Sequence, residues 1–408
     1  MTKALYDELP YDREFEAKVI ELEKEDGYYK LILDQTLFFP EQGGQSSDIG
    51  YIDGIKIYDV QIIDGTIYHY LKLDITNEDE RETAESSLEN RFLPDTIIRG
   101  TIDWNHRFNN MQQHTGEHIF TGIAHKKYGA ENVGFHLSDN TVTLDLNIEL
   151  TKEQIDDIET KANEVIANNV PVICYYPSEL ELDKIEYRSK KEIEGAVRLV
   201  EIEGVDICAC CAPHVSSTSQ VGLLKVLSAT KYKGGTRVSI LCGLRALTDY
   251  RQKQHQLEES IKLLNCPLEE VSKKASKLLE ENKTLKYKLS QIQSEGFLRE
   301  IAKYNADENL GKEDVIIFTE GVETKALRDG VNLMMSKHKG ICAVFNEEIE
   351  SKFNFILGSE LIDCNDVAAT LRAIFDAKCG GSNKMIQGSI EADAEEIRAT
   401  LDNLKNIK

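Results

Sequence analysis

The stretch MQQHTGEHIF, residues 111–120, carries two histidines four positions apart within a run of helical periodicity. Residues i and i+4 of an α-helix lie on one face, with Cβ atoms about 5–6 Å apart, so His114 and His118 can point at one metal ion. An ordinary helix with two solvent-exposed histidines has the same spacing. The spacing alone therefore leaves a metal site and a plain helix both open.

The segment DICACCAPHV, residues 206–215, carries a second pair with this spacing, Cys210 and His214. Thiolate and imidazole are ligands that suit zinc better than magnesium or calcium. The two pairs together predict a four-ligand zinc site. By spacing the sulfur ligand is Cys210, but a proline in the segment makes the backbone irregular, so Cys208 and Cys211 stay open as alternatives.

Length and composition indicate a multidomain globular protein. A chain of 408 residues, 41% of them hydrophobic, is too long for one compact core and too apolar to be disordered. The acidic N-terminus is unlike a signal peptide, and the sequence has no run of about 18 apolar residues that could cross a membrane. We expect a cytoplasmic protein whose nine cysteines are reduced, as metal ligands or small core residues.

The residue pattern divides the chain into four parts, which indicate an α+β multidomain fold. Residues 1–92 alternate apolar and polar side chains between tight turns such as Asp53-Gly54, which predicts a small β-barrel. Residues 93–246 mix helical and strand patterns around the predicted zinc site. Residues 247–295 carry a heptad repeat, and residues 296–408 alternate short apolar runs with helical segments, as an α/β sheet covered by helices does.

The heptad repeat places apolar residues such as Leu278, Leu285 and Leu289 at alternating steps of four and three. Pro267 interrupts the repeat, so we expect two helices that meet near residues 265–267 as a hairpin or coiled coil. The apolar face could pack within one chain or form the seam of a homodimer. The sequence leaves both possibilities open.

The net charge of −23 argues against non-specific binding of nucleic acid, because a polyanion is repelled at long range. The charge is uneven, however, and residues 215–250 carry five basic residues and one acidic residue. Lys231, Lys233 and Arg237 in this stretch are therefore candidates for binding an anionic partner. They could equally be solvated surface charges.

Three motifs give the chain a family resemblance. LDQTLFFPEQGGQSSDIGYI, residues 33–52, resembles the first motif of the editing domain of alanyl-tRNA synthetases and of the free-standing AlaX proteins. MQQHTGEHI, with the later Cys-x-x-x-His pair, resembles the metal-binding motifs of that domain. CGGSNKMIQGSI, residues 379–390, resembles the glycine-rich signature of the DHHA1 domain. The match runs in order over nearly the whole chain and fits best the long form of AlaX, which ends in a DHHA1-like domain.

The resemblance implies a zinc-dependent hydrolase that cleaves the ester joining serine, or also glycine, to tRNA(Ala). It implies tRNA binding at Gly380, Gly381 and Gly388 of the DHHA1 signature, although these glycines could simply form a structural turn. It also implies a homodimer held by the helical segment and the C-terminal domain. Because the editing motifs begin near the N-terminus, we expect no aminoacylation core and no use of ATP.

The chain departs from the family pattern beside the sulfur ligand. The family has Gly-Gly-Thr-His after the ligand cysteine, where this chain has Cys-Ala-Pro-His at residues 211–214. This departure is a further reason to keep the alternative cysteines open.

The first editing motif supplies candidate substrate residues. Gly43 and Gly44 let backbone N–H groups approach a small ligand closely and could stabilise an oxyanion, while Gln45 could orient a water or the ester. Thr36 could hydrogen-bond the serine hydroxyl, which alanine lacks, or be an ordinary strand threonine.

Two charged residues near the histidines also have two interpretations each. Glu117 could act as a general base or support a metal ligand, or simply be exposed. Arg107 could contact the substrate through a tRNA phosphate, or pair with a carboxylate.

Two rival classes of function remain open. One is a non-catalytic tRNA-binding module whose zinc only holds the fold. The other is an editing enzyme for a different tRNA, since threonyl-tRNA synthetases carry a related zinc fold. The sequence also leaves open whether the metal activates water, holds the substrate or holds the fold.

Overall fold

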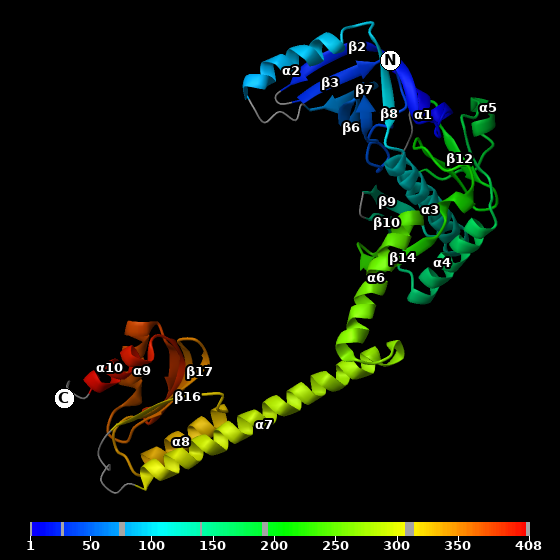
Figure 1. Cartoon of the computed structure of the whole chain (residues 1–408). Helices are drawn as coiled ribbons and strands as arrows, with labels where there is room; N and C mark the ends of the chain where they lie inside the picture. The colour runs from blue at the N-terminus through cyan, green and yellow to red at the C-terminus, as the bar shows by residue number, and fades with distance from the viewer. Residues whose placement is uncertain are drawn as a thin grey trace. The chain divides into compact units, whose positions relative to one another are not determined.

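The computed structural model describes residues 2–25, 28–72, 78–138, 141–189, 195–306 and 314–404. The chain divides into two compact units, Met1–Gln256 and Leu257–Lys408, which are treated separately below. Both units combine sheets with helices, so the predicted α+β multidomain class is confirmed (Figure 1). The finer division at residues 92, 246 and 295 stays a prediction. No helix among the described residues is long and apolar enough to cross a bilayer.

The first unit begins with a closed six-stranded barrel, as the sequence predicted. Its strand order is β2-β3-β7-β6-β5-β8. Along β2 the apolar residues Phe15, Ala17 and Val19 are buried and the polar residues between them are exposed, which is the alternation of a strand with one buried face. The strands are β2 (Glu14–Glu25), β3 (Tyr28–Leu33), β5 (Gly50–Ile52), β6 (Ile55–Ile63), β7 (Thr66–Leu71) and β8 (Ile97–Ile102).

Short elements flank the barrel. The two-residue strands β1 (Lys3–Ala4) and β4 (Gln35–Thr36) pair in parallel, and α1 (Leu5–Glu8) follows the first of them. Helix α2 (Glu78–Arg91) lies between β7 and β8 in the chain.

The rest of the first unit surrounds helix α3 (Trp104–Tyr128). A four-stranded antiparallel sheet has the order β14-β15-β10-β9, and a three-stranded sheet has the order β11-β12-β13. These strands are β9 (Asn132–Leu137), β10 (Val142–Leu146), β11 (Val172–Tyr175), β12 (Leu199–Ile202), β13 (Asp206–Ala209), β14 (Leu224–Tyr232) and β15 (Gly235–Cys242). The accompanying helices are α4 (Lys152–Ala167) and α5 (Glu179–Leu182).

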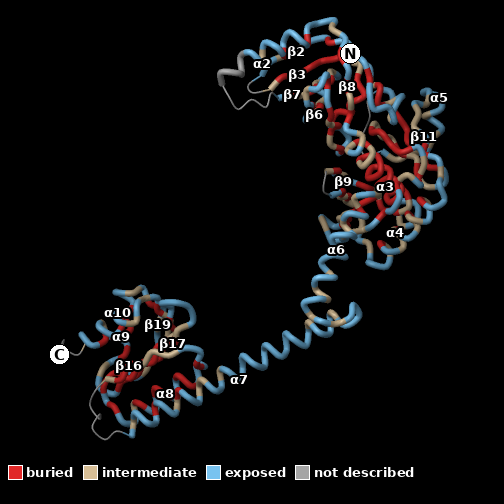
Figure 2. The backbone as a smooth tube through the Cα atoms, in the orientation of Figure 1, coloured by how far each residue is buried: buried red, intermediate tan, exposed pale blue. Residues whose placement is uncertain are grey.

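Helix α3 is buried along its middle. Asp103 caps its N-terminus by accepting a hydrogen bond from the His106 backbone N–H, and Gly129, with a φ of 66°, ends it. Every residue from 110 to 122 is buried (Figure 2). The alternative of two solvent-exposed histidines on this helix is therefore wrong, and its polar side chains need partners inside the protein.

The second unit is a mixed five-stranded sheet covered by helices, as predicted. The order is β16-β17-β18-β20-β19, with β16 and β17 parallel and the other neighbours antiparallel. The strands are β16 (Val315–Glu320), β17 (Cys342–Ile349), β18 (Lys352–Gly358), β19 (Lys378–Gly381) and β20 (Met385–Glu391). The helices after β16 are α8 (Thr324–Met335), α9 (Cys364–Phe375) and α10 (Ala394–Asn403).

The heptad segment forms two helices, α6 (Gly243–Leu264) and α7 (Val271–Asn305), with the short turn η2 (Leu268–Glu270) between them. The predicted break near residues 265–267 is confirmed, but α7 runs ten residues past the predicted boundary at 295. Its last turns pack through Phe297 and Ile301 against the core of the second unit. Its heptad leucines are exposed, so they do not form the predicted hairpin seam within the described part of the chain (Figure 2).

Candidate metal centre and its surroundings

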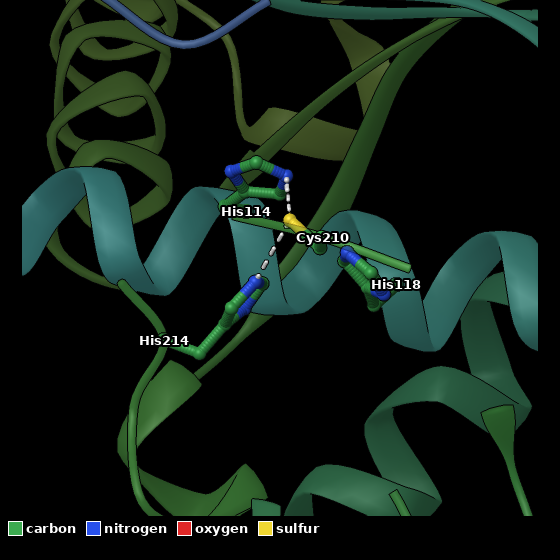
Figure 3. Close-up of side chains that lie close together, drawn as sticks. All are labelled: His114, His118, Cys210 and His214. Carbon is green, nitrogen blue, oxygen red and sulfur yellow. Dashed lines mark hydrogen bonds between the residues drawn. The ribbon is translucent and has the colours of Figure 1, made fainter. Parts of the chain in front are cut away.

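Four side chains meet against helix α3. His114 and His118 come from the helix, while Cys210 and His214 come from the irregular segment after β13 (Figure 3). Their nitrogen and sulfur atoms all lie within 4.8 Å of one another. The Cys210 Sγ lies 3.5 Å from Nε2 of His114 and 3.4 Å from Nε2 of His214. The structure thus brings both predicted pairs together.

Each histidine of this cluster has its Nδ1 occupied by another residue. Gln45 Oε1 lies 2.7 Å from Nδ1 of His114, and Thr115 Oγ1 lies 3.0 Å from Nδ1 of His214. Asp206 Oδ2 lies 3.2 Å from Nδ1 of His118. The Gln45 and Asp206 oxygens can only accept hydrogen bonds, so they favour the Nδ1–H tautomers of His114 and His118, whose Nε2 lone pairs are then directed into the cluster. The Thr115 hydroxyl can accept from His214 in the same way.

The cluster fits a tetrahedral metal ion such as zinc. Nε2 of His118 is buried and has no hydrogen-bond partner, which is costly for a polar atom unless an ion occupies its lone pair. Three imidazoles and one thiolate form a ligand set typical of zinc. Burial would lower the pKa of His118, but the hydrogen bond to Asp206 and the charges of Cys208 and Glu117 raise it above its ordinary value. Metal binding would therefore release a proton from this site.

The geometry favours Cys210 over its neighbours as the sulfur ligand. Cys208 is buried beside Asp206, and burial raises its pKa to about 11. Burial also raises the pKa of Cys211 to about 12, and a Cβ added to Gly43 would lie 3.5 Å from its sulfur, so this thiol faces the glycine loop. Only the Cys210 sulfur, of the three, contacts two histidines within the described residues.

The Gly-Gly-Gln loop lies against the same cluster. Gly43 and Gly44 have φ angles of 63° and 83°, which favour glycine, and the Gly44 carbonyl accepts a 2.7 Å hydrogen bond from Leu137 N. Gln45 is fully buried with its Oε1 on His114, and its Nε2 donor has no partner. The loop therefore presents an unused donor beside the histidines.

Thr36 lies in the short strand β4 beside the barrel, and its hydroxyl contacts His69 and Phe38 and not the His/Cys cluster. Its hydroxyl is 2.8 Å from Nε2 of His69 and accepts a 3.0 Å hydrogen bond from Phe38 N. Because Nδ1 of His69 donates to the Leu31 carbonyl at 2.9 Å, Nε2 must accept the proton of Thr36. Burial lowers the pKa of His69 to about 4, only partly offset by the Leu31 bond, so this histidine is neutral.

Arg107 corrects one prediction. It is fully buried, and its Nε lies 3.0 and 3.1 Å from the carboxylate oxygens of Asp48. Its Nη1 and Nη2 donate to the carbonyls of Pro10 and Leu37. A guanidinium with these partners holds the start of α3 against the barrel, so of the two interpretations the structure shows the pairing with a carboxylate.

Glu117 is also buried, so the alternative of a simply exposed glutamate is wrong. Its Oε1 accepts hydrogen bonds from Thr121 Oγ1 and Asn132 Nδ2, while its Oε2 lies 3.9 Å from Nε2 of His118. This places Glu117 beside a metal-ligand candidate. A role as general base stays a prediction.

The basic candidates lie at the hairpin of β14 and β15. Arg237 forms a two-pronged pair with Asp145, at 2.6 and 2.7 Å, and lies over the ring of Tyr232. Lys231 is exposed and pairs with Glu149, and Lys233 is exposed and lies over the same tyrosine ring. Acidic partners offset part of the basic charge here.

The glycine-rich stretch in the second unit is a β-hairpin, whereas the sequence suggested a loop. Gly380 and Gly381 lie in β19 and Gly388 lies in β20. A Cβ on Gly388 would come within 2.3 Å of the Lys378 carbonyl, and one on Gly381 within 2.3 Å of the Met385 carbonyl. Close strand approach therefore accounts for these two glycines, while Gly380 is open to solvent.

No sequence pattern pointed to the residues that support these histidines. Asp206, Thr115 and Arg188 stand at no recognisable spacing from the histidines, and only the tertiary structure brings them to the cluster. Burial would raise the pKa of Asp206, but hydrogen bonds from His118 and Arg188 lower it.

Comparison with known proteins shows similarity to alanyl-tRNA editing proteins and alanine–tRNA ligases. A model described as "Threonyl and Alanyl tRNA synthetase second additional domain" matches residues 197–239, which include Cys210 and His214. A model of class II (A) tRNA synthetases matches residues 2–89, which include most of the barrel. The alanyl-tRNA editing protein AlaX-L of Pyrococcus horikoshii is 28% identical, over 97% of this chain and 96% of that protein. The resemblance to the long AlaX proteins is confirmed.

The same chain is similar to parts of larger enzymes. The alanine–tRNA ligase of Methanococcus aeolicus is 29% identical over 98% of this chain, and that of Pyrococcus furiosus is 27% identical over 99%. The chain spans 42% and 43% of the length of these ligases. The crystal structure of the C-Ala domain of Aquifex aeolicus alanyl-tRNA synthetase matches 23% of this chain and 87% of its own length, at 20% identity. Its TM-score of 0.20 is too low to bear on the fold.

Proposed function

We propose that the chain is a zinc-dependent hydrolase that removes serine, and also glycine, from mischarged tRNA(Ala) in the cytoplasm. The observation that carries the proposal is the 2.7 Å contact between Gln45 of the Gly-Gly-Gln loop and His114 of the metal cluster. It joins the two editing motifs in one place. The similarity to AlaX-L, whose name describes alanyl-tRNA editing, supports the substrate class.

The ligands in this proposal are His114, His118, Cys210 and His214. Bound zinc would supply a Lewis acid that polarises a carbonyl or a water. Three of the four ligands are buried and Cys210 is partly exposed, so the substrate has to approach from the Cys210 side.

The chain's own residues bind and orient the ester. The unpartnered Nε2 of Gln45 donates a hydrogen bond to the ester or to the attacking water, and the N–H groups of Gly43 and Gly44 stabilise the developing oxyanion. A serine hydroxyl that reaches Thr36 must donate to it, because the Thr36 proton is already given to His69. Alanine and glycine have no hydroxyl to donate, so their esters lose this interaction and serine is the preferred substrate.

The deciding experiment measures the deacylation of Ser-tRNA(Ala) beside Ala-tRNA(Ala), Gly-tRNA(Ala) and mischarged tRNAs of other identity. We expect serine to be lost from tRNA(Ala) faster than glycine or alanine, and no deacylation in the His114→Ala variant. Equal rates for serine and alanine esters would refute the proposal. Selective deacylation of another tRNA would favour the rival editing enzyme, which the shared threonyl and alanyl family description keeps open.

A non-catalytic tRNA-binding module is the second candidate. Four protein ligands fill a tetrahedral zinc site, which is the pattern of a structural metal. This candidate predicts that the protein binds tRNA(Ala) with zinc present and never deacylates it.

We also propose how tRNA and a second copy of the chain bind. Lys231, Lys233 and Arg237 would contact phosphates, and the β19–β20 hairpin with Gly380, Gly381 and Gly388 would lie against the tRNA backbone. The exposed heptad face of α7 would pair with α7 of a second copy. Deleting residues 296–408 should weaken tRNA affinity and change the oligomeric state.

A further inference from the structure

An ion pair lies directly behind one of the metal-ligand candidates. Asp206, at the start of β13, accepts from Nδ1 of His118 at 3.2 Å. Arg188 donates to both oxygens of the same carboxylate, from Nε at 2.8 Å and from Nη2 at 2.8 Å. The side chains of His118 and Asp206 are 2% and 3% exposed, so the contact is shielded from water.

This pair could be mistaken for part of a second metal site, because His118, Asp206 and Cys208 lie within 4.8 Å of one another. The guanidinium of Arg188 argues against that interpretation. It places a positive charge on both oxygens that would have to bind the cation, and it uses the lone pairs that a ligand would offer. The cluster is suited to supporting His118 and unsuited to holding an ion of its own.

Arg188 is itself fixed in two ways. Its Nη2 donates to Thr121 Oγ1 at 2.9 Å, which ties it to helix α3 one turn after His118. Its backbone N–H bonds to the Ile207 carbonyl and its carbonyl accepts from Ala209 N, so it runs along β13 beside Asp206. The orientation of the carboxylate is therefore set by both α3 and β13.

A glycine on α3 makes this approach possible. Gly122 stands one helical turn after His118, and a Cβ built on it would lie 2.7 Å from Cβ of Asp206 and 2.9 Å from the Val205 carbonyl. Any larger residue here would push Asp206 away from the helix. The position of the carboxylate thus depends on a residue that has no polar group.

We propose that Asp206 is the positioning residue that fixes the His118 ring and keeps its Nε2 available to the metal. Arg188 orients the Asp206 carboxylate through an ion pair, and Gly122 leaves the space that this carboxylate needs. Asp206 acts through His118 and does not touch the ion. Partners of this kind hold a metal-bound histidine in one tautomer and orientation, and their loss typically weakens metal affinity about 10–100-fold. The inference rests on the proposed zinc site and goes beyond its four ligands.

The test measures zinc affinity of the full chain by competition with a chromogenic chelator. Asp206→Ala should weaken affinity about 10–100-fold. Asp206→Asn should weaken it less, because the amide oxygen still accepts from Nδ1. Gly122→Ala should weaken affinity while leaving every polar group in place. The visible absorption bands of the cobalt-loaded protein should shift in the same variants, which a general loss of stability would not cause.

Asp145→Asn provides the matched control. It breaks another two-pronged arginine–carboxylate pair in the same unit, with Arg237, away from the cluster. Zinc affinity within twofold of wild type in both Asp206→Ala and Gly122→Ala would overturn the inference while leaving the metal site intact, and so would an equal loss in Asp145→Asn. A wild-type protein that binds no zinc would overturn the proposed function as well.

Discussion

Replacing Arg107 by methionine tests the reassignment of this residue from substrate binding to structure. The change keeps much of the side-chain volume but removes the donors to Asp48, Pro10 and Leu37. The Asp48 side chain is 1% exposed, so its charge would be left buried without a counterion.

The expected cost is large. Removing one partner of a buried ion pair typically costs about 3–5 kcal/mol, and each carbonyl that loses its donor adds about 1–3 kcal/mol. A domain is stable by only about 5–15 kcal/mol. We therefore expect Arg107→Met to lose at least 3 kcal/mol, roughly the lower bound for a broken buried pair. The Asp48→Asn, Arg107→Met double variant should lose less than the two single changes together, because no unpaired charge remains.

The chain offers a convenient probe for this measurement. Trp104, the one tryptophan, begins α3, stacks on Phe108 and lies under Arg13, so its fluorescence reports unfolding of the first unit. Urea titrations of the wild type, both single variants and the double variant give the coupling energy. If Arg107→Met keeps its unfolding free energy within about 1 kcal/mol of wild type but loses affinity for tRNA(Ala), the structural assignment is wrong and Arg107 binds substrate.

Three further predictions use the same protein. Cys210→Ala should lose most of the zinc in elemental analysis while Cys208→Ala keeps it, because of the two sulfurs only that of Cys210 contacts two histidines. Zinc retained in Cys210→Ala and lost in Cys208→Ala would reverse the assignment. The pKa of His69 is about 4 in the folded protein and 6.5 in the unfolded chain. Between pH 6.5 and 4 the unfolded chain binds a proton at this histidine and the folded protein does not, so the free energy of unfolding decreases as the pH falls from 6.5 to 4. Relative to His69→Gln, the wild type should lose about 3 kcal/mol between pH 6.5 and 4, and parallel stability curves would contradict the neutral assignment. If α7 forms the dimer seam, the Leu285→Lys, Leu289→Lys double variant should abolish self-association in sedimentation. Leu279 is an exposed leucine outside the heptad positions, so Leu279→Lys should leave self-association unchanged. An equal effect of both variants would count against the seam.

Local pattern was enough to predict several elements because the relevant interactions are short-range. The helical periodicity of residues 111–120 indicated the middle of α3, because it depends only on neighbouring residues. Alternation along β2 indicated a strand with one buried face, and the break at Pro267 divided the heptad segment. His114 and His118 were also visible, since i,i+4 spacing fixes which side chains share a helical face. Cys210 and His214 lie in an irregular segment, and their residue types pointed to zinc although no helix holds them.

The roles of charged and polar residues could not be predicted in the same way. Arg107 and Asp48 are far apart in the chain, and only the packing of α3 against the barrel decides that they form a buried pair and leave no guanidinium for substrate. The glycine-rich stretch near Gly388 looked like a loop, because sequence does not reveal that two strands approach too closely for a Cβ.

The sequence by itself determined the elements, the ligand types and the family resemblance, because periodicity, capping and residue chemistry are properties of short segments. The tertiary structure alone decided which atoms those ligands face. It placed Gln45 on His114 and Asp206 on His118, and it brought Arg188 behind Asp206 where Gly122 leaves room. Hydrogen bonds between buried groups depend on positions fixed to a few tenths of an ångström by the whole core, and no local pattern encodes them.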